Sequence, residues 1–233
     1  MKVGIMQPYL FPYIGYFQLI HAVDKFVVYD DIEYSKKGWV NRNRILVNGK
    51  DQLFTLPLKK DSDYLHISKR KLADNYRTEA KKIFNKINSI YKNAPYYDEV
   101  NRLIFDCLTY EDRNLFNFVY HSIREIINFL EIKTELLIFS KIGIKERLKG
   151  EQCVIQICKH LKASQYINAI GGVELYNKKI FLKENIKLNF IKSNFIEYKQ
   201  FDTIFVPWLS IIDIMMFNST KEIKKMLYSY ALI

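Results

Sequence analysis

Apolar residues recur along the chain with the spacing of strands and of helices in turn, and this alternation predicts an α/β fold. Short apolar runs of the kind found in buried strands predict strands over residues 1–6, 25–29, 135–139, 165–168, 187–191 and 203–206. Helical spacing predicts helices over residues 12–24, 150–161, 173–184 and 209–217. A strand, a helix and a strand in succession make a βαβ unit, so the first two strands should be parallel. The whole pattern indicates a Rossmann-like, mostly parallel sheet with helices on both faces.

The middle of the chain departs from this alternation. Apolar runs at residues 45–47 and 52–58 flank Asn48-Gly49, a dipeptide that favours a two-residue hairpin turn, and residues 64–68 suggest another short strand. Three stretches with helical spacing follow, over residues 74–93, 96–110 and 112–130. We therefore expect a single α/β domain over residues 1–233, with a core from residues 1–70 and 134–220 and a helical insertion at residues 74–131.

Composition limits the class of protein. Hydrophobic residues make up 49% of the chain, which is enough for a core, and only 8 glycines and 5 prolines argue against long flexible linkers. No apolar stretch reaches the roughly 18 residues of a membrane helix, and we expect no signal peptide. Three cysteines, Cys107, Cys153 and Cys158, cannot all pair within one chain. This favours a reducing, cytoplasmic setting.

The net charge of +11 has two possible explanations. A phosphate-bearing partner would explain it, and so would compositional drift, because lysine is abundant throughout the chain. The basic residues do not form one block and no nucleic-acid motif accompanies them, so a nucleic-acid partner is not expected. A diffuse positive field suits an anionic small molecule and is also compatible with peripheral contact to an anionic membrane surface. Nothing in the sequence indicates the oligomeric state.

Ligands of open parallel sheets bind beyond the carboxyl ends of the strands, so the segments after the strands are the candidates for a site. After the first strand, Pro8 and Pro12 stiffen a loop rich in tyrosine. Gly15 lies one turn into the next helix, where glycine costs about 1 kcal/mol relative to alanine. Either a ligand phosphate approaches the backbone there, or the helix packs closely on a strand. The substrate-binding candidates here are Gln7, Pro8, Tyr9, Tyr13, Gly15 and Tyr16.

After the second strand come two carboxylates and then a run of directional donors. Asp30 and Asp31 are candidate catalytic bases, because adjacent carboxylates at a strand end hold hydroxyls, take up protons or are simply solvated. Arg42 and Arg44 lie on one face if the segment is extended, a geometry suited to a phosphate or carboxylate. The alternative is a surface loop of salt bridges. The binding candidates of this loop are Trp39, Asn41, Arg42, Asn43 and Arg44.

Two later segments complete the candidate set. Asn168 ends a strand, and Gly171-Gly172 offers free backbone N–H groups like those of anion sites, although such a pair alone is a weak signal. Glu174 is a further candidate base, and Tyr176 is placed to bind a sugar hydroxyl. Ser210 and Asp213 are also binding candidates, and the alternative is that they serve as an N-cap and a first-turn charge. We expect Gln7, Tyr9, Tyr13, Gly15 and Tyr16 to line one pocket with Asn168, Gly171 and Gly172.

A metal site is not expected from the sequence. The four histidines are scattered along the chain. Cys153, Cys158 and His160 share a helix, but their spacing does not converge as in metal-binding helices. The sequence also has no phosphate-binding loop of the Walker type and no nucleophile elbow.

Several long motifs resemble one known family. The stretches "IMQPYLFPYIGYFQLIHAVDKFVVYDDIEY", "GWVNRNRI", "YINAIGGVELY" and "FVPWLSIIDIMMFN" are similar to those of the WbqC-like family, over residues 1–218. The resemblance implies a role in bacterial surface-polysaccharide biosynthesis, including O-antigen and lipopolysaccharide. It also implies a transferase that adds a glycyl or other acyl group to the amine of a nucleotide-linked amino sugar.

A second, weaker resemblance is to Rossmann-like nucleotidyltransferases with an HxGH motif. Gly15 matches the glycine of that motif, but Tyr13 and Tyr16 stand where the histidines would be. By analogy with enzymes of this fold that form amides, ATP with magnesium is the cofactor to consider. Asp30, Asp31 or Glu174 would then take the proton of the sugar ammonium. The loss of both histidines favours the alternative, a non-catalytic factor that binds a nucleotide sugar or assembles glycan machinery.

Overall fold

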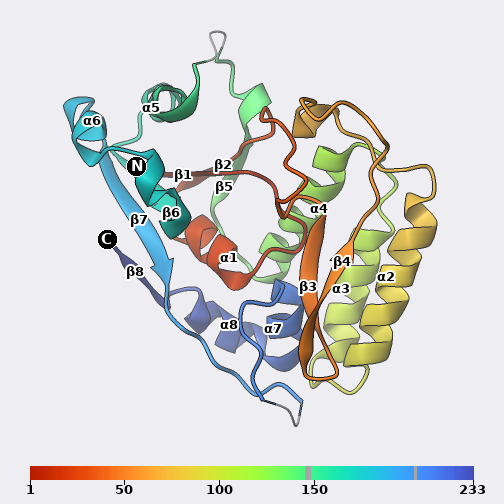
Figure 1. Ribbon diagram of the computed structural model, residues 1–233. Coiled ribbons are helices and arrows are strands. Elements are labelled where there is room, and N and C mark those ends of the chain that lie inside the picture. Colours follow the sequence, from red (N-terminus) through yellow and green to blue (C-terminus); the bar gives the residue numbers. More distant parts are fainter. Residues whose placement is uncertain (145–147, 202–203) are drawn as a thin grey trace.

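A computed structural model describes residues 1–144, 148–201 and 204–233, and within them the chain forms a six-stranded sheet (Figure 1). The strand order is β5-β2-β1-β6-β7-β8. Neighbouring strands are parallel except β8, which is antiparallel to β7. The predicted parallel pairing of the first two strands is confirmed, with Met6 opposite Val28. The strands are β1 (Lys2–Met6), β2 (Lys25–Val28), β5 (Glu135–Ile138), β6 (Gln165–Ala169), β7 (Lys187–Ser193) and β8 (Tyr230–Leu232).

Helices cover both faces of this sheet, as the sequence predicts. Successive residues of β2 alternate between the two cores: Phe26 packs in the same cluster as Phe17 of α1, and Val27 packs in the cluster that holds Ile157 of α5. No helix of the described residues is long and apolar enough to cross a membrane. The helices around the sheet are α1 (Ile14–His21), α5 (Gly150–His160), α6 (Lys178–Lys183), α7 (Ile211–Phe217) and α8 (Thr220–Met226).

A hairpin and three further helices lie beside the sheet. The predicted hairpin is confirmed as β3 (Arg42–Val47) and β4 (Lys50–Thr55), joined by Asn48 and Gly49 with φ of 49° and 72°. Positive φ at both positions is what a type I′ turn requires. The backbone N–H of Leu46 donates to the hydroxyl of Tyr91, which fastens β3 to the end of a helix. The helices are α2 (Tyr76–Tyr91), α3 (Tyr97–Leu108) and α4 (Leu115–Phe129).

Three local predictions were wrong. Residues 64–68 form a turn and the start of a 3₁₀ helix, η1 (Ile67–Lys69), with one isolated bridge between Glu33 and His66. The helix expected at residues 173–184 is divided between a 3₁₀ helix, η3 (Ile170–Leu175), and α6, because Tyr176 is extended and Asn177 caps α6. Thr203 of the last expected strand lies outside the described residues, and residues 204–206 form no strand. The side chain of Gln200 instead pairs with both backbone groups of Val206.

The C-terminal elements α8 and β8 were not expected from the hydrophobic pattern. A readable signal does precede α8: Ser219 and Glu222 form a capping box, in which each side chain bonds the backbone N–H of the other. Gln18 of α1 donates to the carbonyl oxygens of Met226 and Ser229, so the C-terminal elements are tied to the first βαβ unit.

Candidate functional site

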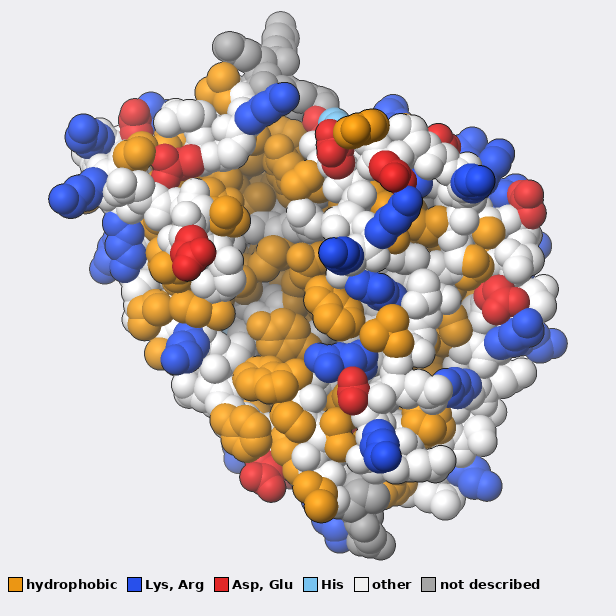
Figure 2. Space-filling model, in the orientation of Figure 1, with side chains coloured by type: hydrophobic (Ala, Val, Ile, Leu, Met, Phe, Trp, Pro, Cys, Tyr) orange, Lys and Arg blue, Asp and Glu red, His pale blue; other side chains and the backbone are white. Residues whose placement is uncertain are grey.

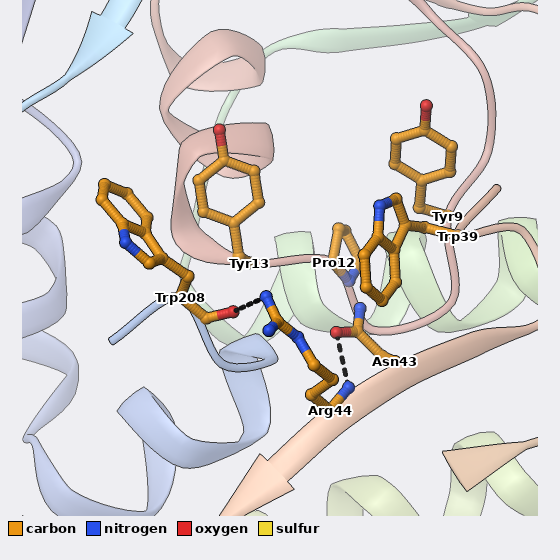
Figure 3. Close-up of a pocket in the computed structure, with 7 residues that line it drawn as sticks. All are labelled: Tyr9, Pro12, Tyr13, Trp39, Asn43, Arg44 and Trp208. Atoms are coloured by element: carbon orange, nitrogen blue, oxygen red, sulfur yellow. Dashed lines mark hydrogen bonds between the residues drawn. The ribbon is translucent and has the colours of Figure 1, made fainter. Parts of the chain in front are cut away.

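A cavity of about 190 Å³ opens beside the start of α1, where the loop after β1 meets the first residues of β3 (Figure 3). Three segments far apart in the sequence build it: the loop that leads into α1, the segment from residue 39 into β3, and the turn before α7. It follows the carboxyl end of β1, where open parallel sheets bind ligands. The residues that line it are Tyr9, Pro12, Tyr13, Trp39, Asn43, Arg44 and Trp208.

Asn43 holds the loop that forms one wall of the cavity. Its side-chain amide donates to the carbonyl oxygens of Leu10 at 2.9 Å and Phe11 at 2.8 Å. Ser210 donates to the same Phe11 oxygen at 2.7 Å and also caps α7. Phe11 has a φ of 44°, which is strained for a bulky residue. Asn43 and Ser210, both predicted to bind substrate, therefore hold this strained loop in place.

Arg44 brings unsatisfied hydrogen-bonding capacity to the cavity. One of its terminal nitrogens lies 3.1 Å from Asp51 and the other donates to the Trp208 carbonyl at 3.4 Å. Its Nε is buried and has no hydrogen-bond partner among the described residues. A buried donor without a partner costs about 1–3 kcal/mol. Arg44 lines the cavity, so its guanidinium is a positive charge available to a phosphate or carboxylate there.

The two arginines lie on the same face, as their spacing predicts, but they are in β3 and not in the expected loop. The guanidinium carbons of Arg42 and Arg44 lie 5.7 and 5.4 Å from the ring centroid of Trp39. Arg42 donates to the carbonyl oxygens of Gly38 and Lys37, so it closes the turn that presents Trp39. Both cations therefore orient this indole, and Arg44 alone of the pair lines the cavity.

Aromatic rings form most of the remaining wall. The rings of Tyr13 and Trp208 meet edge to face with centroids 6.2 Å apart (Figure 3). Trp208 has a φ of 59°, which is a rare backbone conformation for tryptophan and costs about 1–3 kcal/mol. Burial raises the pKa of Tyr9, with the neighbouring Tyr13 as a smaller cause, so the Tyr9 hydroxyl stays protonated at neutral pH. The cavity thus offers ring faces, tyrosine hydroxyls and one cation.

Comparison of the sequence with known proteins identifies the family of this chain. A profile of the WbqC-like protein family matches residues 7–225, which include every residue that lines the cavity. The chain belongs to the WbqC-like protein family. It is also 27% identical over 224 residues, 95% of each chain, to a protein of Mycobacterium tuberculosis described as "Uncharacterized protein Rv1507c". No solved structure gives a significant match to the chain.

Gly15 of this WbqC-like chain is explained by the ring of Tyr13. A Cβ added at Gly15 would lie 2.4 Å from the ring atoms of Tyr13. The close approach that the sequence suggested is therefore made by a residue that lines the cavity. Tyr16 points elsewhere: its ring is buried beside Phe26 and its hydroxyl donates to the Gln7 carbonyl at 3.0 Å. Gln7, Pro8, Gly15 and Tyr16 do not appear in the cavity wall, and their contact with a ligand stays a prediction.

The candidate bases lie at the same edge of the sheet, outside the cavity lining. The Tyr29 N–H donates to the Met6 carbonyl, so the ends of β1 and β2 are adjacent. Asp30 is buried and accepts a hydrogen bond from the Ser140 N–H at 2.9 Å. Asp31 Oδ1 lies 2.8 Å from His66 Nδ1, and the His66 side chain is 42% exposed. The sequence analysis missed His66, because no local pattern pairs it with a residue 35 positions away.

The segment after β6 also lies outside the cavity wall as described. Gly172 is needed because a Cβ there would come within 2.1 Å of the Asn168 amide nitrogen. Gly171 and Glu174 are exposed. Tyr176 packs against Tyr166 and Phe181, with centroids 5.8 and 5.9 Å apart. The structure places these residues at the same sheet edge as the cavity, because Gly4 of β1 pairs with Ile167 of β6, but their shared pocket stays a prediction.

Asp213 and Asn41 are buried and fully engaged by the protein. Asp213 accepts hydrogen bonds from the hydroxyls of Tyr91 at 2.7 Å and Tyr198 at 2.6 Å, and from the Gln200 amide at 2.8 Å. Burial raises the pKa of Asp213, and the three donors oppose this shift. Asn41 accepts from the Tyr34 hydroxyl and donates to the Leu56 carbonyl. In this conformation both side chains support the site from behind its wall.

Metal-binding groups do not gather within the described part of the chain. No three His, Cys, Asp or Glu side chains there are close enough to hold an ion together. Cys153 and Cys158 are buried in the core on one side of the sheet. Burial raises the pKa of Cys158 to about 12, so its thiol stays protonated.

Proposed function

We propose that this chain is an enzyme of polysaccharide biosynthesis that binds a phosphate-bearing sugar substrate in the cavity between Trp39, Arg44 and Trp208. The observation that carries the proposal is the guanidinium of Arg44 in a cavity whose other described lining residues are mostly aromatic. A guanidinium is suited to a phosphate or carboxylate, and aromatic faces are suited to a sugar or base ring. Membership of the WbqC-like family also supports a role in polysaccharide biosynthesis.

The size of the cavity limits which part of the substrate it holds. An engineered cavity of about 150 Å³ in another protein accommodates one benzene molecule, so about 190 Å³ suits a single ring. A nucleotide sugar is larger than this, and the rest of it must extend along the surface. Figure 2 shows a hollow lined by apolar side chains on this face, with basic side chains along one side of it. The hollow gives an extended substrate room beyond the cavity.

The reaction that the WbqC-like resemblance implies is acyl transfer to a sugar amine, with glycyl as one candidate group. The amine nitrogen attacks the carbonyl carbon of an ATP-activated acyl donor, a C–N bond forms, and the activating group leaves with its bonding electrons. The ammonium of the sugar must first lose a proton. We assign that step to His66, whose Nδ1 faces Asp31 and whose other nitrogen can then accept a proton. Asp30 and Glu174 remain less favoured candidates, because Asp30 already accepts the Ser140 N–H and Glu174 is exposed to solvent.

A second candidate function is binding without catalysis, and one observation favours it. The described residues that line the cavity are aromatic side chains, a proline, an asparagine and an arginine. A carboxylate or imidazole, which proton transfer would need, does not appear among them. The cavity alone therefore has the chemistry of a binding site for a nucleotide sugar, as an assembly factor would require.

Both tryptophans of the chain line the cavity, so intrinsic fluorescence reports on the site directly. Titration with nucleotide-linked amino sugars, nucleoside triphosphates and free sugars should change the emission for the phosphate-bearing sugars. Incubation of a binding sugar with ATP, magnesium and amino or carboxylic acids should give a product heavier by one acyl unit in mass spectrometry. Saturable binding without any product in the whole panel would instead support the non-catalytic function. Unchanged emission with every nucleotide sugar would contradict both functions.

A further inference from the structure

A chain of aromatic contacts leads from the cavity to the protein surface. The ring centroid of Trp208 lies 6.2 Å from that of Tyr13 and 6.5 Å from that of Phe195. Phe195 meets Phe205 at 5.8 Å, and Phe205 meets Tyr198 at 5.1 Å. We call these five residues, Tyr13, Trp208, Phe195, Phe205 and Tyr198, the aromatic strip. Its first two members also line the cavity, so the strip continues the proposed site outward.

A shallow groove runs along the aromatic strip. It shares Tyr13 and Trp208 with the cavity, so the two hollows adjoin at these residues. Its other lining residues are almost all apolar: Ile14, Asn194, Phe195, Ile196, Tyr198, Phe205, Pro207, Leu209 and Ile214. The cavity thus contains the guanidinium of Arg44, and the groove that adjoins it has no charged residue in its described lining.

The outer part of the strip is exposed to a degree that is unusual for large apolar residues. Phe195 is 61% exposed, Trp208 is 51% exposed, and Ile204, which directly precedes Phe205, is 91% exposed. Contiguous exposed apolar groups of this kind mark binding surfaces more often than single ones do. The strained backbone of Trp208 adds to this, since its φ of 59° fixes an exposed indole at the junction of the two hollows.

We infer that the substrate of this site carries a hydrocarbon chain: a sugar phosphate linked to a lipid, with its charged part at Arg44 and its chain along the aromatic strip. The inference rests on the proposed function, because it extends the same phosphate-binding cavity. Charge decides the orientation. The guanidinium of Arg44 can only favour the anionic end, and the uncharged groove can only favour the apolar end. A bilayer docked on the strip is the competing occupant, and the experiment below distinguishes it.

The experiment is a titration with alkyl phosphates of increasing length, from methyl phosphate to decyl phosphate, below their micelle concentrations. The variant Trp39→Phe leaves Trp208 as the sole reporter, and its emission should shift to the blue as the chain covers the indole. Burial of a methylene in an apolar site increases affinity up to about fourfold. We expect Kd to fall by about two- to fourfold per added carbon until the groove is filled.

A matched pair of surface variants locates the effect. Phe195→Ser should flatten the dependence of Kd on chain length and leave the Kd of methyl phosphate unchanged. Leu182→Ser, at a residue of α6 that is 69% exposed, should keep the full dependence. Circular dichroism and melting temperature would show that both variants are folded.

Three other results would overturn the inference in distinguishable ways. If sugar phosphates bind but Kd is independent of alkyl length, the lipid-linked substrate is excluded and the proposed function stands. If the length dependence is absent and Phe195→Ser abolishes sedimentation with vesicles of anionic phospholipid, the strip docks a bilayer instead. If methyl phosphate and nucleotide sugars both fail to bind, the proposed function is wrong, and the inference that rests on it is wrong as well.

Discussion

The ring of Tyr13 lies where the side chain of Gly15 would be, so that a Cβ at Gly15 would come within 2.4 Å of its atoms. Only glycine at this position lets Tyr13 stand at the start of α1 and line the cavity. Alanine is the better helix former by about 1 kcal/mol, and the half-buried Tyr13 ring can turn away from a new methyl group. We expect the ring to turn into the cavity, because it already forms part of the cavity wall.

Gly15→Ala should therefore leave the melting temperature within a few degrees of the wild type while weakening nucleotide-sugar binding about tenfold. Tryptophan fluorescence measures the binding and circular dichroism measures the melting. The double variant Tyr13→Ala/Gly15→Ala has no ring to displace, and it should recover part of the cavity volume. A large loss of melting temperature with intact binding would mean that Gly15 serves only helix packing.

The amide of Asn43 is expected to be a stability determinant as well as part of the cavity. Asn43→Ala leaves two buried carbonyl oxygens, those of Leu10 and Phe11, without this donor. The free energy of unfolding should fall by about 1–3 kcal/mol in urea titrations. Asn128→Ala, at an exposed position of α4, should change it by less than about 0.5 kcal/mol. Equal stability of the two variants would show that the loop needs no anchor.

The buried Asp213 predicts a specific dependence of stability on pH. Its pKa in the folded protein is raised by burial above the unfolded value of about 3.8. The stability that it contributes is therefore fully present below the unfolded pKa and is lost as pH rises through the folded pKa. The free energy of unfolding of the wild type relative to Asp213→Asn should decrease from pH 3.5 upward. An increase over this range would mean that Tyr91, Tyr198 and Gln200 outweigh burial.

His66 should affect turnover without affecting binding, if the proposed acyl transfer occurs. His66→Gln removes the proton acceptor, and general-base catalysis contributes about 10²- to 10⁴-fold. The rate of product formation should fall by that factor, while the Kd of the nucleotide sugar stays the same. His160→Gln, a change on α5, is the control. Equal rates for the two variants would remove the Asp31–His66 pair from the mechanism.

Local patterns predicted much of the fold and part of the site. The βαβ unit, the Asn48-Gly49 hairpin and the central helices are encoded within short windows of sequence, and these elements were predicted correctly. Tyr9, Tyr13 and Arg44 were found because they follow strand ends or carry directional donors. Trp208 was not identified as a wall of the cavity, because its position depends on contacts such as that between Ser210 and Phe11, which are 199 residues apart. The hydrogen-bond partners of Asp213 were not predicted for the same reason, since they come from distant elements.

The most direct test of the account is the affinity of a nucleotide-linked amino sugar for Arg44→Met, measured by isothermal titration calorimetry beside Arg102→Met. Arg102 is an exposed residue of α3, so its replacement removes the same charge without touching the cavity. A lost hydrogen bond to a charged group costs about 1.5–3 kcal/mol, which is about 10- to 150-fold in Kd. The account predicts that loss for Arg44→Met and an unchanged Kd for Arg102→Met. Equal affinities for the two variants would contradict it, because the cavity between Trp39 and Trp208 would then not be the binding site.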